Sequence, residues 1–267
     1  MSTRIAILGG GVMGETLLSA LLRAGHSPSD VVVAEKFEER AAELRATHRV
    51  EVVDPAPAVE GADVVLVVVK PQDVAAVLGQ VADVVGSDAV VVSLAAGVRT
   101  DVIEAALPAG TAVVRAMPNT PALVGQGMFG ISPGAACSDE QLALVASLLE
   151  TGGVVATVDE SAQDAVTAVS GSGPAYVFYL AEAMIAAGTE AGLDPDTART
   201  ATVQTLRGAA ALLEASDEDP AELRRRVRSP NGTTHAAITT FDERGVREGL
   251  EAGVAAAAAR SAELSEG

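Results

Sequence analysis

The sequence predicts an α/β protein with an N-terminal doubly wound sheet followed by an all-helical C-terminal domain. Short apolar segments alternate with helical segments between Arg4 and about Val158, and several of them are unbroken valine runs. Such runs are typical of parallel strands that helices cover on both faces. After Asp159 the alternation stops and only helical segments follow. We therefore expect a first domain over residues 1–159 and a second over residues 160–267.

A glycine-rich turn joins the first strand to the first helix. Residues 5–8 form an apolar strand, Gly9-Gly10-Gly11-Val12-Met13-Gly14 fits G-x-G-x-x-G, and a helix over 15–24 follows. This order of strand, motif and helix is the context of a Rossmann-type dinucleotide site. There the first glycine makes the tight turn, the second lets the pyrophosphate approach the backbone, and the third lets helix and strand pack closely. We expect cofactor contacts from Gly9, Gly11, Val12, Met13 and Gly14.

The remaining strands of the first domain are separated by turns that Gly or Pro marks and by helical stretches. Expected strands cover residues 31–34, 50–53, 64–69, 89–94, 112–116, 128–131 and 154–158. Expected helices include 72–85, 101–106 and 139–150. The last two strands and the helix between them form a shorter β-α-β tail.

The end of the second strand carries side chains that favour two different cofactors. Glu35 lies about twenty residues after the last glycine, where an acid would hold the ribose hydroxyls of NAD. Lys36 and Arg40 lie beside it, and basic groups there suit the 2′-phosphate of NADP. We expect NADPH to be the preferred cofactor, with NADH also usable.

Three further loops follow strands of the sheet and are expected to rim the cofactor crevice, because open α/β sheets bind ligands at the carboxyl ends of their strands. Lys36 and Lys70 are the only lysines of the chain, and both lie at such strand ends. The candidate residues in these loops are Lys70, Pro71, Ala95, Ala96, Gly97 and Asn119.

A second anion site is predicted between two helices of the C-terminal domain. Asp219 as N-cap, Pro220 and a capping-box Glu222 begin the first of these helices, and Pro230 ends it. The next helix begins at Thr233 or Thr234, so its free N–H groups and positive dipole end point into the turn. A substrate carboxylate would fit there. The candidate residues are Ser229, Gly232, Thr233 and Thr234.

Composition excludes several classes of partner. A formal charge of −18 and a pI near 4.4 argue against nucleic acid and anionic membranes, which would repel such a surface. The single cysteine, Cys137, excludes an internal disulfide framework. The most apolar helix, over 175–187, is interrupted by Glu182 and does not qualify as a membrane span. With a strand beginning within four residues of the N-terminus, we expect a cytoplasmic protein without a signal peptide.

Five motifs stand out along the chain: the glycine turn, 69–72, 117–121, 169–175 and 229–234. Through these motifs nearly the whole chain resembles the pyrroline-5-carboxylate reductases, which catalyse the last step of proline biosynthesis. The resemblance implies NAD(P)H-dependent reduction of a cyclic imino acid to L-proline. It also implies that Ser229, Gly232 and Thr233 hold the substrate carboxylate and that Thr234 bonds the ring nitrogen. Val12 and Arg228 depart from the family's usual residues.

The same resemblance implies that the helical domain serves dimerisation. Family members are dimers that often assemble further into decamers, and we expect a homodimer or a higher homo-oligomer. Two rivals stay open from the sequence. The β-hydroxyacid dehydrogenases join a similar glycine turn to a helical domain, but they use a lysine from that domain, and this chain has none after Lys70. A non-enzymatic NADP-binding sensor would not need the second anion site.

Overall fold

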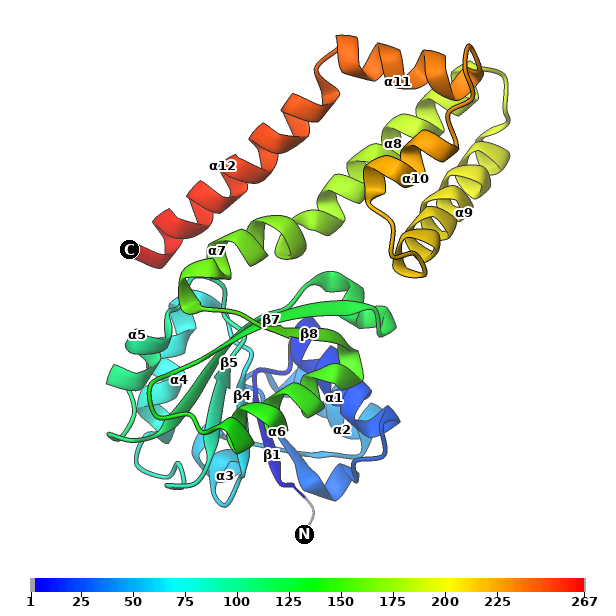
Figure 1. Ribbon diagram of the computed structural model, residues 1–267. Coiled ribbons are helices and arrows are strands. Elements are labelled where there is room, and N and C mark those ends of the chain that lie inside the picture. Colours follow the sequence, from blue (N-terminus) through cyan, green and yellow to red (C-terminus); the bar gives the residue numbers. More distant parts are fainter. Residues whose placement is uncertain (1–2, 267) are drawn as a thin grey trace. The chain divides into compact units, whose positions relative to one another are not determined.

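The structure of the chain is a computed structural model that describes residues 3–266. Its residues group into two compact units: the chain up to Ser172 together with the segment from Ala257 onwards, and the segment Gly173–Ala256. The first unit holds the sheet, and the second is helical (Figure 1). The division expected after Asp159 stays a prediction.

The first unit is built on one eight-stranded sheet in the order β3-β2-β1-β4-β5-β6-β7-β8. The first six strands run parallel in the order 3-2-1-4-5-6 of a Rossmann fold, with the switch point between β1 and β4. The β-α-β tail is present as β7 and β8, which are parallel to each other, but β7 runs antiparallel to β6. The strands are β1 (Ile5–Leu8), β2 (Val31–Ala34), β3 (Glu51–Val53), β4 (Val64–Val67), β5 (Val90–Ser93), β6 (Ala112–Met117), β7 (Gly127–Pro133) and β8 (Gly153–Thr157).

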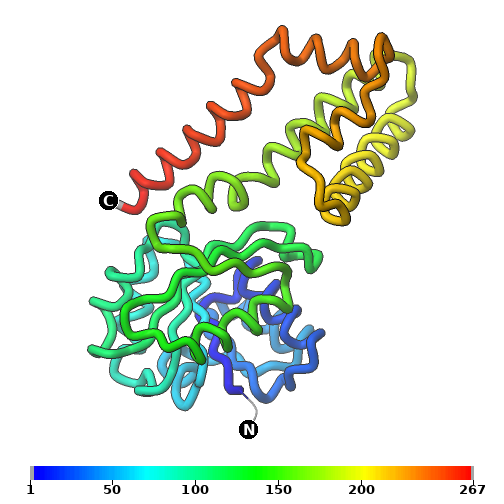
Figure 2. Tube along the Cα trace, in the orientation of Figure 1, coloured from blue at the N-terminus to red at the C-terminus, as the bar shows by residue number. Residues whose placement is uncertain are grey.

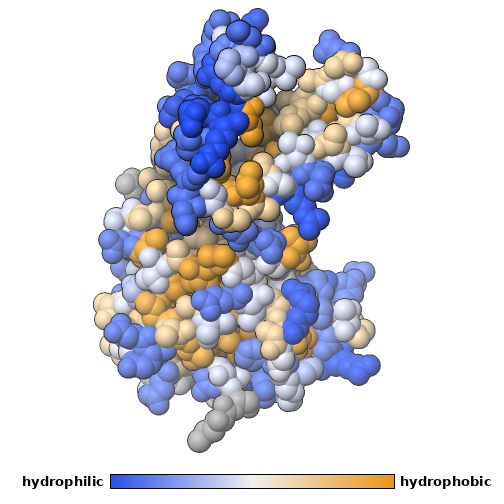
Figure 3. Space-filling model, turned by 45° about the vertical axis from the view of Figure 1, so that its right-hand side comes forward, coloured by the Kyte–Doolittle hydropathy of each residue, from blue (hydrophilic) through white to orange (hydrophobic). Residues whose placement is uncertain are grey.

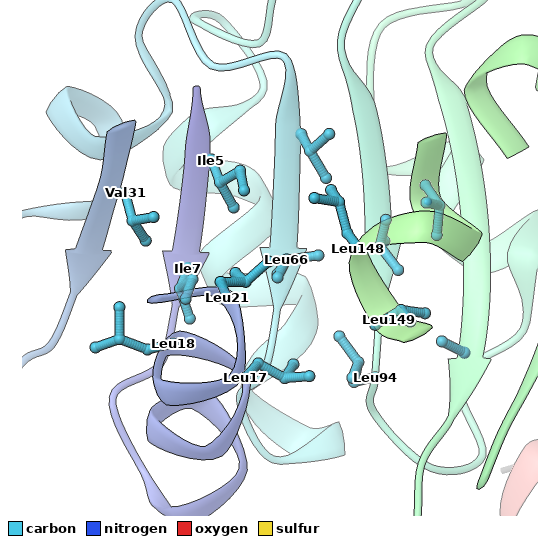
Figure 4. Close-up of a cluster of buried hydrophobic side chains, with 14 of the residues drawn as sticks. Ile5, Ile7, Leu17, Leu18, Leu21, Val31, Leu66, Leu94, Leu148 and Leu149 are labelled. Atoms are coloured by element: carbon cyan, nitrogen blue, oxygen red, sulfur yellow. The ribbon is translucent and has the colours of Figure 1, made fainter. Parts of the chain in front are cut away.

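Helices cover both faces of this sheet. Alternate residues of the first six strands belong to two separate cores, one on each face, so Ile5 and Ile7 pack in one and Ala6 and Leu8 in the other. On the first face Leu17, Leu18 and Leu21 of the first helix point onto the strands, with leucines of α6 farther along (Figure 4). The helices of this unit are α1 (Val12–Arg23), α2 (Glu38–His48), α3 (Pro55–Val59), α4 (Val74–Val81), α5 (Thr100–Ala105), α6 (Asp139–Leu149) and α7 (Gln163–Val166).

Short 3₁₀ turns and one π-helical segment lie between the helices and strands. The helix expected over 72–85 is a 3₁₀ turn, η2 (Pro71–Asp73), followed by the shorter α4. A π-turn, η6 (Thr167–Gly171), follows α7. Further 3₁₀ turns are η1 (Pro28–Asp30), η3 (Thr120–Val124), η4 (Glu150–Gly152) and η5 (Glu160–Ala162).

The helical unit has almost no core of its own. Ala198 and Thr202 are the only buried residues within Gly173–Ala256, all of which the structure describes. The helices α8 and α9 pack along each other, as the tube in Figure 2 shows. The helices are α8 (Gly173–Glu190), α9 (Pro195–Glu214), α10 (Pro220–Arg226), α11 (Thr233–Glu243) and α12 (Val246–Glu266), of which α12 continues into the first unit.

Large apolar side chains of α8 lie at the surface of the single chain. Phe178 is 66% exposed and Tyr179 is 75% exposed. Apolar residues reach the molecular surface among polar ones in Figure 3. Exposed apolar side chains of this size are typical of a surface that a second subunit covers.

Among residues 3–266 no helix is long and apolar enough to cross a membrane.

One detail of the capping prediction is wrong. The Asp219 side chain accepts a hydrogen bond from the Ala221 N–H at 2.8 Å, so it does cap α10. The Glu222 carboxylate does not reach back to the N-cap, because it bonds the Arg225 guanidinium one turn further on. The Arg225 guanidinium donates to both Glu222 oxygens, a bidentate ion pair that replaces the single capping bond.

Candidate active site

A cavity of about 550 Å³ lies at the switch point of the sheet, where the chain leaves β1, β2 and β4. Ligands of open α/β sheets bind at this place. Five of the predicted cofactor residues line the cavity together: Gly9, Gly11, Glu35, Lys36 and Lys70.

The glycine turn requires its glycines for steric reasons. Gly9 has φ +113°, and an added Cβ would lie 2.8 Å from the carbonyl oxygen of Val68. A Cβ on Gly14 would collide with the carbonyl oxygen of Gly9. Gly11 has open space beside it and is the N-cap of α1 without a side-chain cap, so N–H groups of the first turn are available to an anion. The turn therefore has the form that a pyrophosphate needs.

Val12, Met13, Gly14 and Pro71 do not line the cavity. Val12 is 70% exposed at the start of α1, while Gly14 is buried beneath it. Pro71 begins the 3₁₀ turn that follows Lys70 and sets its direction. A role for these four residues in cofactor binding stays a prediction.

Both lysines of the chain lie in the wall of the cavity. Each is exposed, and neither forms an ion pair with another residue of the described chain. The Lys36 Nζ lies 5.0 Å from the centre of the Phe37 ring. An amine that is not paired within the protein is available to a phosphate. Asp54 and Asp73 line the same cavity, and their negative charges balance the positive charges of the two lysines.

Arg40 is not available in the same way. Its Nε donates to the carbonyl oxygen of Gly10 at 2.8 Å, and its Nη1 donates to Glu43 at 2.9 Å. Its Nη2 bonds the Glu15 carboxylate. The guanidinium is thus committed to protein groups and does not line the cavity.

The loop after β5 lies outside the cavity. Ala95 is buried, Ala96 is exposed, and the Ala95 N–H donates to the Ser93 hydroxyl at 3.3 Å. Gly97 has φ +75°, and an added Cβ would lie 3.1 Å from the carbonyl oxygen of Leu264. The loop is therefore in contact with the end of α12, and a role for it in cofactor binding stays a prediction.

Asn119, in the loop after β6, forms hydrogen bonds to the protein from both ends of its side-chain amide. Its Nδ2 donates to the carbonyl and hydroxyl oxygens of Ser170, each at 3.2 Å. Its Oδ1 accepts from the Met128 N–H at 2.9 Å. The side chain ties η6 to β7, and a role for it in cofactor binding stays a prediction.

In the helical unit, α11 begins without a side-chain cap. Gly232 is its N-cap, and the Gly232 N–H is bonded within the turn to the carbonyl oxygen of Ser229 at 3.1 Å. Asn231 has φ +58°, one of two non-glycine residues with positive φ among residues 3–266. The hydroxyls of Ser229, Thr233 and Thr234 have no hydrogen-bond partner within the described chain. The turn therefore offers free N–H and O–H donors to an anion.

His235 follows this turn and has a defined partner. Its Nδ1 accepts a hydrogen bond from the Arg228 Nε at 2.9 Å, so the ring proton of the neutral imidazole is on Nε2. Arg228 and His235 thus bridge the two ends of the turn. Among the described residues, this is the only hydrogen bond formed by the side chain of Arg228, the residue that differs from the family's usual one.

Two titratable groups near the sheet are perturbed for structural reasons. Hydrogen bonds from His48 and then Arg40 hold the pKa of Glu15 below its ordinary value. Burial raises the pKa of the Cys137 thiol, with Asp139 adding to the effect, so this cysteine is not an activated nucleophile. No group of three or more potential metal ligands is found among residues 3–266.

Phe37 lines the same cavity, although the glycine motif did not single it out. It is 63% exposed, lines the cavity and belongs to a chain with only four phenylalanines and two tyrosines. An exposed aromatic ring in such a wall offers a stacking face to a base. The sequence could have indicated Phe37, because it lies two residues after Glu35 in a chain with few aromatic residues.

Comparisons with known proteins cover both units. The family model described as pyrroline-5-carboxylate reductase dimerisation matches residues 160–264, and one described as coenzyme F420-dependent NADP oxidoreductase matches residues 4–97. The chain is 46% identical to the pyrroline-5-carboxylate reductase of Mycobacterium leprae, over 98% of this chain and 96% of that protein.

Solved structures agree. The pyrroline-5-carboxylate reductase of Coxiella burnetii superposes with a TM-score of 0.94 at 33% identity and covers 99% of both chains. The Plasmodium falciparum pyrroline carboxylate reductase with NADP bound superposes with a TM-score of 0.89 over 98% of both chains. At 23% identity, the second likeness concerns the fold.

Proposed function

The chain belongs to the pyrroline-5-carboxylate reductase family, and we propose that it reduces 1-pyrroline-5-carboxylate to L-proline with NADPH as hydride donor. The observation that carries the proposal is the presence of two anion sites in one chain: the glycine turn at the switch-point cavity and the uncapped start of α11. The first suits a dinucleotide and the second suits a carboxylate.

The cavity fits the nicotinamide cofactor of the family. The glycine turn would hold the pyrophosphate at the start of α1, and Phe37 offers a face to the adenine. Lys36 and Lys70 would contact phosphate groups. When bound, NADPH supplies a hydride to the imine carbon, while the C=N electron pair moves to the already protonated nitrogen.

The task of the helical unit is to bind and orient the imino acid. Ser229 and the N–H groups of the α11 start hold the substrate carboxylate in this proposal, and the hydroxyl of Thr234 bonds the ring nitrogen. A protonated imine is electrophilic without a strong acid beside it, so positioning is the main contribution of these residues. His235 is already bonded to Arg228 and is not assigned as a proton donor.

The protein is a homo-oligomer, as the matching dimerisation family and the exposed apolar face of α8 indicate. We propose that its dimers assemble further, up to a decamer. Its partner in the reaction is a small imino acid, and nothing indicates a nucleic acid or membrane partner. A cytoplasmic location is part of the same proposal and would be checked by fractionation of cells.

The preference for NADPH rests on Lys36. Its ammonium is unpaired at the cavity wall, whereas Arg40 is committed to protein groups. We expect Lys36→Ala to raise the KM for NADPH much more than that for NADH, and the preference of the wild type to weaken as salt increases. Equal effects on both cofactors would show that Lys36 does not contact the 2′-phosphate.

A steady-state assay tests the function itself. NADPH oxidation is followed with and without 1-pyrroline-5-carboxylate, and 3-hydroxyisobutyrate with NADP is the control for a β-hydroxyacid dehydrogenase. We expect turnover with the imine only. Cofactor binding without turnover would favour the sensor, and oxidation of the hydroxy acid would favour the dehydrogenase.

A further inference from the structure

The middle glycine of the turn, Gly10, is buried, and side chains from the end of β2 and from α2 bond both of its peptide groups. Its N–H donates to the Glu35 Oε2 at 3.0 Å, and its carbonyl oxygen accepts from the Arg40 Nε at 2.8 Å. A buried peptide group that loses its partner costs more than an exposed one. These two bonds therefore fix the conformation of the glycine turn.

Each oxygen of the Glu35 carboxylate accepts a hydrogen bond from the backbone. Its second oxygen, Oε1, accepts from the Phe37 N–H at 2.9 Å, so each oxygen already has a partner. Glu35 lines the cavity, but its oxygens are held by the N–H groups of Gly10 and Phe37, whereas an acid that holds the ribose hydroxyls presents its oxygens to the ligand. The two N–H donors also offset its negative charge, which reduces the repulsion of a phosphate nearby.

Arg40 is fixed in turn by two carboxylates. Glu15, on the first turn of α1, bonds its Nη2, and Glu43 bonds its Nη1 at 2.9 Å. Glu15 is bonded from its other oxygen by the His48 Nε2 at 2.8 Å. The start of α1, both ends of α2 and the glycine turn are thus joined by one hydrogen-bond network.

We propose that Glu35 and Arg40 are positioning residues that brace Gly10, and that neither distinguishes NADPH from NADH. This inference deepens the proposed function, on which it rests for the identity of the cofactor. It explains how an acid at the end of β2 is compatible with NADPH. Lys36, whose ammonium is unpaired within the described chain, is then the residue that recognises the 2′-phosphate.

The test compares Glu35→Gln and Arg40→Lys with Glu39→Gln, a matched control that removes an exposed charge of α2 without a partner among the described residues. Affinities for NADPH and NADH are measured without imine by fluorescence titration. A glutamine keeps only one acceptor oxygen for two N–H donors, and a lysine cannot make all three guanidinium contacts. We expect both variants to lose affinity for both cofactors by a similar factor, about three- to tenfold, and the control to lose none.

A second readout needs no ligand. Hydrogen exchange by mass spectrometry, in a peptide that spans the glycine turn, should be faster in Glu35→Gln and unchanged in Glu39→Gln, measured at a temperature at which both variants are folded. If Glu35→Gln lowers affinity for NADH while raising it for NADPH, or if exchange in the turn does not change, Glu35 is a ribose-binding residue and the proposal is wrong. If Glu35→Gln does not fold, cofactor affinities and hydrogen exchange measured on Arg40→Lys test the proposal in its place.

The binding and exchange measurements separate this proposal from the proposed function. A protein that binds NADPH but fails to reduce the imine would refute the reductase assignment. Whether the variants lose affinity for NADPH and NADH equally or unequally would still decide the role of Glu35 and Arg40.

Discussion

Thr234 gives the sharpest test of the substrate site. Its hydroxyl, in the first turn of α11, has no hydrogen-bond partner within the described chain, whereas the hydroxyl of Thr240 on the same helix donates to the Ala236 carbonyl at 3.0 Å. The first is free for a substrate and the second is not. Thr234→Ala should therefore remove one hydrogen bond to a charged group in the transition state, about 1.5–3 kcal/mol. Because 1.36 kcal/mol is one decade in rate, kcat/KM for the imine should fall about 10- to 150-fold.

The assay measures kcat/KM for 1-pyrroline-5-carboxylate at saturating NADPH, together with the Kd of NADPH and the Tm. We expect the Kd and the Tm to be unchanged in Thr234→Ala and most of the activity to return in Thr234→Ser. Thr240→Ala is the matched control and should keep full kcat/KM. An unaltered kcat/KM in Thr234→Ala would remove this hydroxyl from the reaction.

Three further predictions concern stability and assembly. Glu15→Gln should lower the free energy of unfolding at pH 7 by about 1 kcal/mol or less, as measured by urea titration. Because hydrogen bonds from His48 and Arg40 depress the Glu15 pKa, this difference in stability between variant and wild type should vanish as the pH falls below 4.5. A difference that persists in acid would contradict this cause. Asn119→Ala loses three hydrogen bonds and should lower the urea midpoint by the equivalent of about 1–3 kcal/mol, which an unchanged midpoint would refute. Phe178→Glu should shift sedimentation toward smaller species, and an unchanged oligomer would place the interface elsewhere.

Strand positions were predictable because valine runs buried on both faces leave a direct trace in the sequence. All eight expected strands are present, and β1 and β2 have the expected bounds. The antiparallel direction of β7 was not predictable, because apolar runs record burial and not direction. The split before α4 follows from Pro71, whose ring favours a turn at a helix start.

The candidate sites divide in a similar way. The glycine turn and the uncapped start of α11 are local in sequence, so their motifs predicted them. The roles of Glu35, Arg40 and Asn119 depend on which distant atoms they meet: Arg40 is thirty positions from Gly10 and Asn119 fifty-one from Ser170. Residue type suggested cofactor contacts for all three, and only the folded chain shows their protein partners.

The most direct test of the central claim is transfer of an isotope label. NADPH deuterated at the transferable position of its nicotinamide is incubated with the protein and 1-pyrroline-5-carboxylate, and the product is analysed by mass spectrometry and NMR. We predict L-proline with one deuterium on ring carbon 5, the former imine carbon, in equal amount to the NADPH oxidised. Oxidation of NADPH without labelled proline, or no oxidation at all, would contradict the assignment.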